Sequence, residues 1–233
     1  MVVRVDGVDL ARVRFPAARQ FQYISMIKAI LFDVDGVLLD SFEANLKFFQ
    51  DLMTQNGYPP PTREEFSFLF HVNMMDVIRI LTKSDSEEEI KRVWEMGKNG
   101  EIKQNTALMM TPDDAEETIR TLSKDYLLGI VTSRVKEGIY EVPQLARLQN
   151  YFHVTISYQD TINHKPDPEP LLLAAQRLAT IPSECVYIGD VENDVKAARA
   201  AGMKAVVYSK IKYDGADAWT PIFTALPDLI KDL

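Results

Sequence analysis

Two carboxylates stand together at the end of an apolar run, in the stretch KAILFDVDGVLLDS. Side chains two residues apart point the same way along an extended chain, so Asp33 and Asp35 should lie close together if the strand continues through them. At an effective dielectric constant near 20, two like charges about 4 Å apart repel by roughly 4 kcal/mol. A shared proton or a bound cation can offset this repulsion.

A second acidic stretch favours the cation. The sequence YIGDVENDVKAA places Asp190 directly after another apolar run and Asp194 in the first turn of a following helical pattern. Two strand ends that offer only carboxylate oxygens to one cleft form the kind of site that Mg²⁺ prefers. Because Mg²⁺ keeps several water ligands, such a site also leaves room for a substrate phosphate.

Groups that could bind an anion follow two further runs. GIVTSR ends in Thr132 and Ser133, whose hydroxyl and backbone N–H groups would lie at a helix start, where anions are favoured. HKPDPEP places Lys165 before a proline, which favours an extended backbone, and then offers Asp167 as a helix N-cap with Pro168 at the first helical position. Carboxylates, a hydroxyl, a fixed cation and a metal are what phosphoryl transfer requires.

The elements that must position these residues alternate along the chain. Helical patterns separate most of the short apolar runs, which read as strands buried on both faces. This alternation predicts an α/β fold with a doubly wound, Rossmann-like parallel sheet, and ligands bind such sheets at the carboxyl ends of the strands. The predicted strands are 27–33, 126–132, 153–158, 185–189 and 204–208.

One long segment interrupts the alternation. Residues 42–110 show only helical patterns, which predicts an all-helical cap domain inserted after the first strand. Residues 26–41 and 111–233 then form the catalytic core, and the methionines near this boundary, including Met74 and Met110, are interpreted as packing between cap and core. Residues 1–25 form an N-terminal extension of uncertain order, either an added leader or a short arm packed on the core.

Composition excludes several classes of partner. The chain has 233 residues, a formal net charge of -8 and a pI near 5.0, so no basic surface favours nucleic acid or a membrane. The lone cysteine, Cys185, cannot form an internal disulfide, and no apolar run approaches the length of a membrane helix. We expect a cytoplasmic protein acting on a small phosphorylated metabolite, as a monomer or a dimer.

Taken in order, these four stretches resemble the motifs of the haloacid dehalogenase superfamily. The motifs are DVDGVLLDS, Thr132 after its apolar run, the lysine of KPDPEP, and GDVEND. The resemblance covers the chain from about residue 26 to the end. The insertion is placed like the helical cap of the branch that includes phosphoglycolate phosphatase and β-phosphoglucomutase.

The resemblance implies a role for each acid. Asp33 would be the nucleophile that forms an aspartyl-phosphate, and Asp35 the general acid and then the general base. A carboxylate oxygen of Asp33, the backbone carbonyl of Asp35 and the carboxylate of Asp190 would hold Mg²⁺. Asp194 would support this shell or Lys165.

It also implies how the phosphoryl group is held. Thr132, Ser133 and Lys165 would bind its oxygens, and Gly36 would allow the turn that carries Asp35 away from Asp33. Ser133, Arg134 and Glu43 border this site, although a solvated loop would explain them equally well. His71 is interpreted as structural or exposed.

The leading hypothesis is a Mg²⁺-dependent phosphohydrolase for a small phosphate ester. Asp35 favours phosphate esters or anhydrides over carbon–halogen bonds, and Gly189 with Asp190 resembles the phosphatases more than the phosphomutases, which tend to carry Glu-Asp. Three alternatives stay open: a sugar-phosphate mutase, an inorganic pyrophosphatase and a non-catalytic binding protein. The cap segment FLFHVNMMD lacks a glycine common in relatives, so substrate contacts from the cap are not predicted.

Overall fold

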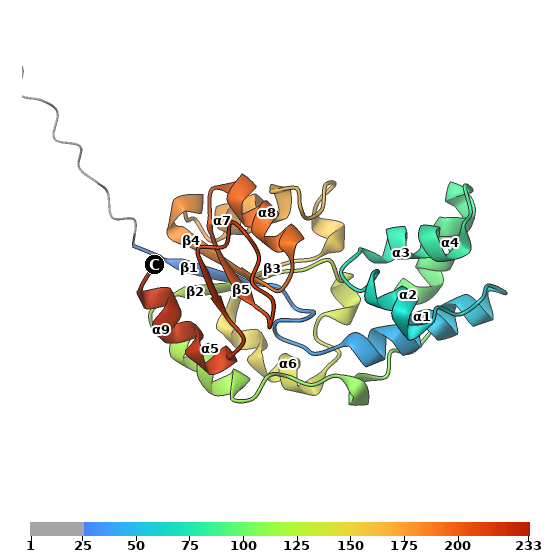
Figure 1. Ribbon diagram of the computed structural model, residues 1–233, viewed down its shortest axis with the longest axis horizontal. Coiled ribbons are helices and arrows are strands. Elements are labelled where there is room, and N and C mark those ends of the chain that lie inside the picture. The colour runs from blue at the N-terminus through green and yellow to red at the C-terminus, as the bar shows by residue number, and fades with distance from the viewer. Residues whose placement is uncertain (1–25) are drawn as a thin grey trace, which may run out of the picture.

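The computed structural model describes residues 26–233, so the predicted extension at 1–25 lies outside the described residues. Six parallel strands form one sheet in the order β3-β2-β1-β4-β5-β6 (Figure 1). Their bounds are β1 Ala29–Phe32, β2 Leu127–Val131, β3 Phe152–Ile156, β4 Cys185–Gly189, β5 Lys204–Tyr208 and β6 Ala218–Thr220. The predicted doubly wound α/β fold is confirmed. Only the three-residue β6 has no counterpart among the predicted strands.

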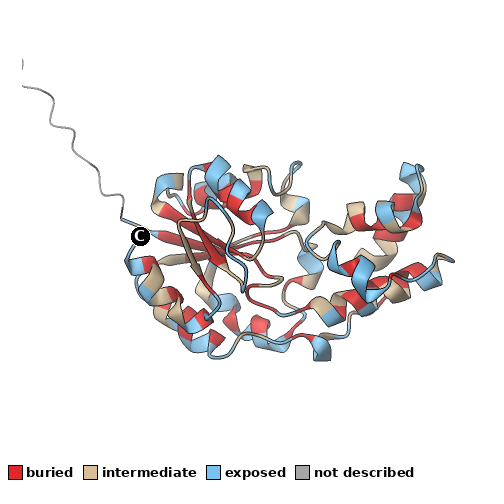
Figure 2. Cartoon of the chain, in the orientation of Figure 1, coloured by how far each residue is buried: buried red, intermediate tan, exposed pale blue. Residues whose placement is uncertain are grey.

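Helices cover both faces of the sheet. Alternate residues of the strands, such as Ile30 and Phe32, pack with α5, α6 and α9 on one face, while Ala29 and Leu31 pack with α7 and α8 on the other. All four are completely buried, as the concentration of buried residues along the strands in Figure 2 also shows. The core helices are α5 Ala115–Leu122, α6 Pro143–Leu148, α7 Glu169–Arg177, α8 Glu192–Ala201 and α9 Leu226–Lys231.

The strand order fixes where a ligand can enter. β1 lies at the centre of the sheet, between β2 and β4. From β1 the chain continues to β2 on one side, and after β3 it crosses back to β4 on the other side of β1. A crevice therefore opens at the carboxyl end of β1, where the direction of the connections changes. Asp33 is the first residue after that strand.

Four helices form a separate body beside this crevice (Figure 1). They are α1 Phe42–Gln55, α2 Arg63–Ser67, α3 Met74–Thr82 and α4 Glu87–Lys98. Their buried side chains form a hydrophobic cluster distinct from the two clusters of the sheet, centred on Phe66, which is 1% exposed. The helical cap agrees with the predicted fold class, while its exact bounds at residues 42 and 110 stay a prediction.

Two segments join cap and core, and they meet at one point. The backbone N–H of Asp40 donates to the carbonyl of Met110 at 2.8 Å, and the N–H of Met110 donates back to Asp40 at 3.1 Å. The neighbouring Met109 is buried in the core, but Met110 is 62% exposed. The prediction that Met110 packs between cap and core is therefore wrong. Across residues 26–233, no helix is both long enough and apolar enough to cross a membrane.

Gly129 in β2 allows the sheet and its covering side chains to pack closely. A Cβ atom at this position would lie 2.6 Å from Cγ1 of Val154 and 2.8 Å from Cδ2 of Leu31. Both neighbours are buried, so neither can move far without disturbing the core.

We predict that Gly129→Val lowers the free energy of unfolding by about 2 kcal/mol, because overpacking forces these side chains off their preferred rotamers. Urea denaturation followed by circular dichroism measures the change. Gly138→Val is the matched control, since a Cβ atom there has no neighbour closer than 3.9 Å. Equal stability of the two variants would contradict the packing explanation.

Candidate active site

Asp33 stands at the floor of the crevice, held by one backbone and one side-chain donor. Its Oδ1 accepts the N–H of Val34 at 2.7 Å, and its Oδ2 accepts a hydrogen bond from Lys165 Nζ at 2.6 Å. Only 11% of the Asp33 side chain is exposed. Burial raises the pKa of Asp33 to about 6, although the Lys165 ammonium acts in the opposite direction.

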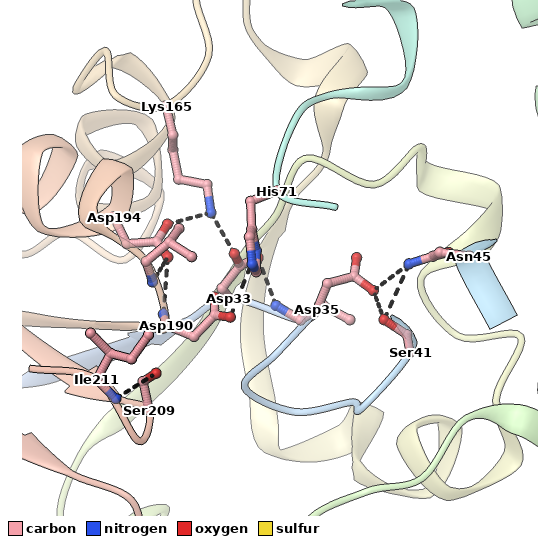
Figure 3. A network of polar contacts seen from close by, with 12 residues as sticks. Asp33, Asp35, Ser41, Asn45, His71, Lys165, Asp190, Asp194, Ser209 and Ile211 are labelled. Atoms are coloured by element: carbon pink, nitrogen blue, oxygen red, sulfur yellow. Dashed lines mark hydrogen bonds and ion pairs between the residues drawn. The ribbon is translucent and has the colours of Figure 1, made fainter. Parts of the chain in front are cut away.

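Lys165 is the positive centre of the site (Figure 3). Its ammonium group donates to Asp33, to Oδ1 of Asp194 at 2.8 Å and to the hydroxyl of Tyr187 at 2.8 Å, which occupies all three N–H donors. Burial alone would lower the pKa of Lys165, but the carboxylates of Asp194 and Asp33 hold that pKa above its usual value. A substrate phosphate that binds Lys165 must therefore replace or share one of these partners.

Asp194 and Asp190 lie at the start of α8, but their surroundings differ. Oδ2 of Asp194 accepts the backbone N–H groups of Asp190 at 3.0 Å and Val191 at 3.3 Å, so this carboxylate is fully hydrogen-bonded. Oδ1 of Asp190 is buried and has no hydrogen-bond partner within residues 26–233. Burial, together with the charges of Asp194 and Asp33, raises the pKa of Asp190 well above its usual range.

The Asp190 oxygen without a partner is one reason to ask whether Asp33, Asp190 and Asp194 could bind a metal ion. Carboxylate oxygens of Asp33, Asp190 and Asp194 lie within 4.8 Å of one another. A buried carboxylate oxygen without a donor is costly in a protein, and a hard cation would supply the missing partner. The residues present therefore fit Mg²⁺.

Two glycines make room for these acids. A Cβ atom on Gly36 would lie 2.0 Å from Oδ2 of Asp190, and one on Gly189 would lie 2.2 Å from Cβ of Asp194. Gly36 also has a φ angle of +79°, in the left-handed region that side chains disfavour. Glycine at position 36 thus serves two purposes: it permits the expected turn, and it leaves space for the Asp190 side chain.

Asp35 points away from Asp33 and toward Ser41 and Asn45 (Figure 3). Because β1 ends at Phe32 and a turn follows it, the chain does not stay extended through Asp35, which was the condition for the two acids to lie close together. Oδ1 of Asp35 accepts hydrogen bonds from the Ser41 hydroxyl and, at 3.3 Å, from the Asn45 amide.

Arg134 donates two hydrogen bonds to the Asp35 carboxylate. Its Nε donates to Oδ2 and its Nη2 to Oδ1, both at 2.7 Å. Only 8% of the Arg134 side chain is exposed, so the alternative of a solvated loop residue is wrong for Arg134. Burial is the largest single influence and would raise the pKa of Asp35, but the Arg134 charge and the hydrogen bonds from Arg134, Ser41 and Asn45 together outweigh it and lower that pKa. In this geometry Asp35 is a carboxylate at neutral pH.

Thr132, Ser133 and one unexpected residue line the same cleft. The Thr132 hydroxyl accepts the N–H of Arg134 at 3.2 Å, which leaves its own proton to donate, and Ser133 is half-buried beside it. His71 reaches in from the cap, with Nδ1 3.7 Å from Oδ2 of Asp190. The interpretation of His71 as a structural or exposed residue missed this contact. Glu43 pairs instead with Arg63 on the exposed side of the cap.

The comparisons with known proteins agree with this architecture. The sequence profile described as haloacid dehalogenase-like hydrolase matches residues 30–208. The chain belongs to this family. Pyrophosphatase PpaX of Bacillus pumilus is 29% identical over 182 residues, which cover 77% of this chain and 82% of that protein.

Two solved structures share the fold of this haloacid dehalogenase-like hydrolase. A HAD-superfamily hydrolase of subfamily IA from Geobacter sulfurreducens is 29% identical, with a TM-score of 0.65, over 88% of this chain and 96% of that one. The β-phosphoglucomutase of Clostridium difficile is 22% identical, with a TM-score of 0.71, over 89% and 98%. For the fold, these structures confirm the predicted resemblance to the branch of the family that has a helical cap.

We predict that Arg134→Met lowers the free energy of unfolding by about 3 kcal/mol, because it leaves the Asp35 carboxylate buried without its partner. The control is Arg147→Met, at an exposed arginine of α6. Chemical denaturation of Arg134→Met, Asp35→Leu and the double variant forms a cycle. The double variant should lose clearly less than the sum of the single losses, and additive losses would contradict the pairing.

We predict opposite effects of Asp190→Asn with and without Mg²⁺. Without the metal, and at a pH high enough to ionise Asp190, removing one of three close negative charges should raise the melting temperature by a few degrees. With excess Mg²⁺, the wild type should gain stability by ligand binding, and the variant should gain little. Thermal denaturation in EDTA and in MgCl₂ measures both effects. A variant that is less stable than wild type in EDTA would contradict the repulsion.

Proposed function

We propose that this protein is a Mg²⁺-dependent phosphohydrolase that cleaves a small phosphate ester through a covalent aspartyl-phosphate on Asp33. The observation that carries the proposal is the pairing of Asp33 with Lys165 at the floor of the cleft, beside an Asp190 oxygen that lacks a partner. This arrangement offers a nucleophile, a fixed positive charge and a place for a cation within one crevice.

In the first step, a carboxylate oxygen of Asp33 attacks phosphorus. A new O–P bond forms while the P–O bond to the leaving group breaks. With a pKa of about 6, Asp33 is mostly ionised at neutral pH and more basic than an ordinary aspartate. Lys165 offsets the repulsion between this carboxylate and an anionic substrate, and Thr132 can donate its hydroxyl proton to a phosphoryl oxygen.

Asp35 acts as the general acid in the first step and as the general base in the second. It gives a proton to the departing oxygen, then takes a proton from the water that attacks the aspartyl-phosphate, which releases inorganic phosphate and restores Asp33. The hydrogen bonds from Arg134 and the lowered pKa favour the carboxylate form of Asp35, which is the form that the second step needs. The first step therefore requires Arg134 to release Asp35 so that it can carry a proton.

The carboxylates of Asp33 and Asp190 and the backbone carbonyl of Asp35 would hold Mg²⁺, and Asp194 would keep Lys165 and the start of α8 in place. When bound, Mg²⁺ would act as a Lewis acid that neutralises charge on the phosphoryl oxygens. The cap would close over the cleft and exclude bulk water. Location in the cytoplasm stays a prediction.

A pyrophosphatase is the second candidate, supported by the name of the Bacillus pumilus relative. The same residues could attack pyrophosphate, with inorganic phosphate as the leaving group. A phosphomutase has less support, because this chain has Gly189 where the phosphomutases of the family tend to carry glutamate. The intact set of acids argues against a binding protein without activity.

We predict that Asp33→Asn reduces the release of inorganic phosphate by a factor of roughly 10³ or more, because an amide is a poor nucleophile. Phosphate release from a panel of phosphate esters and pyrophosphate is measured with Mg²⁺ and with EDTA. Asp51→Asn, on an exposed face of the cap, is the control. Wild-type turnover that EDTA does not affect would contradict the metal requirement, and near-normal turnover by Asp33→Asn would rule out the covalent route.

A further inference from the structure

The cleft between cap and core is much larger than a phosphate group needs. Its volume is about 600 Å³, within the range of pockets that hold whole small organic molecules. Its floor, on the core, carries the charged residues Asp33, Asp35, Arg134 and Lys165. Its cap side carries both polar and apolar residues, and the apolar side chains of Phe48, Phe70, Val72, Met74 and Ile102 are here called the apolar wall.

The apolar wall is anchored in the cap. The Phe70 ring contacts the Phe42 ring at a centroid distance of 5.2 Å but is only half-buried, so part of it lines the cleft. A Cβ atom on Gly97 would lie 2.2 Å from Cε of Met74 and 3.0 Å from Cζ of Phe48. These two side chains therefore rest directly on the backbone of α4.

Most charged groups on the same side of the cleft are engaged within the cap. The Lys98 ammonium lies 5.1 Å from the centre of the Trp94 ring and 3.9 Å from a carboxylate oxygen of Glu95. Asp76 accepts hydrogen bonds from Asn73 and Arg79. Lys103 has no such contact among the described residues, but it is exposed to solvent. Phe70 and Met74 are only half-buried and line the cleft, so each can offer apolar surface to a ligand there.

We infer that the apolar wall binds the leaving group of the substrate, which is a phosphate monoester of an alcohol bearing an aromatic or similarly bulky apolar group. The inference rests on the proposed function, because it takes the floor to be the phosphate site. A ligand with a charged end and an apolar end matches a charged floor that faces an apolar wall. Pyrophosphate has no apolar part and gains nothing from this wall.

Binding of two phosphonates that cannot be hydrolysed tests the inference independently of turnover. 2-Phenylethylphosphonate and ethylphosphonate carry the same charged group and differ only by the ring. Titration calorimetry in the presence of Mg²⁺ should show that the phenyl compound binds roughly ten-fold more tightly or better, because burial of the ring removes apolar surface from water. Equal affinities would overturn the inference.

Three variants locate the effect on the apolar wall. Phe70→Gln and Met74→Gln should each lose most of the preference for the phenyl compound, while affinity for ethylphosphonate stays close to that of the wild type. Phe68→Gln is the matched control, since Phe68 belongs to the same cap segment but is 78% exposed and does not line the cleft. If Phe70→Gln fails to fold, Met74→Gln decides alone. A preference that survives in Met74→Gln would overturn the inference.

Turnover separates this inference from the proposed function. 2-Phenylethyl phosphate and ethyl phosphate are both esters of primary alcohols, so their leaving groups react alike and a higher kcat/KM reports binding. A phenyl preference in binding with no turnover of either ester would refute the phosphohydrolase and keep the apolar wall as a ligand site. Turnover of both esters with equal kcat/KM would refute the inference and keep the phosphohydrolase.

Discussion

Repulsion among three buried carboxylates, those of Asp33, Asp190 and Asp194, is the constraint on which the site depends. None has more than 11% of its side chain exposed, so water screens these charges poorly. Lys165 contacts two of them and leaves the third, Asp190, with an unpartnered oxygen. The fold thus keeps a deficit of positive charge where the proposed Mg²⁺ and substrate phosphate would bind, and uncompensated buried charges of this kind cost stability.

The backbone around the acids is shaped by the same constraint. Gly36 and Gly189 contribute no side-chain atoms, and each leaves space that an aspartate fills. The Tyr187 hydroxyl accepts a hydrogen bond from the Lys165 ammonium and donates one to the carbonyl of Val131 at 3.1 Å. Burial raises the pKa of Tyr187 well above its usual value, so this residue stays neutral and adds no further negative charge.

The sequence predicted what depends on local pattern and missed what depends on long-range contact. Short apolar runs that end in acids are local signals, and they located the sheet and the positions of Asp33 and Asp190. Arg134 lies 99 residues from Asp35 along the chain, and a charged residue in a polar loop carries no sign that it will be buried. His71 was missed for the same reason, because only the folded cap brings it near Asp190. The direction of Asp35 depends on the turn after β1, which the resemblance implied through Gly36 and which the alternation of side chains along an extended chain could not show.

The paired backbone hydrogen bonds between Asp40 and Met110 have a mechanical consequence. Because the chain enters and leaves the cap side by side, these two main-chain hydrogen bonds tie the connecting segments together, so neither segment could bend there without the other. Asn45, near the start of α1, touches the Asp35 carboxylate. Any displacement of α1 would therefore alter the polar contacts of the residue proposed to move the proton, whereas the crossing itself is formed by main-chain atoms and needs no particular side chain.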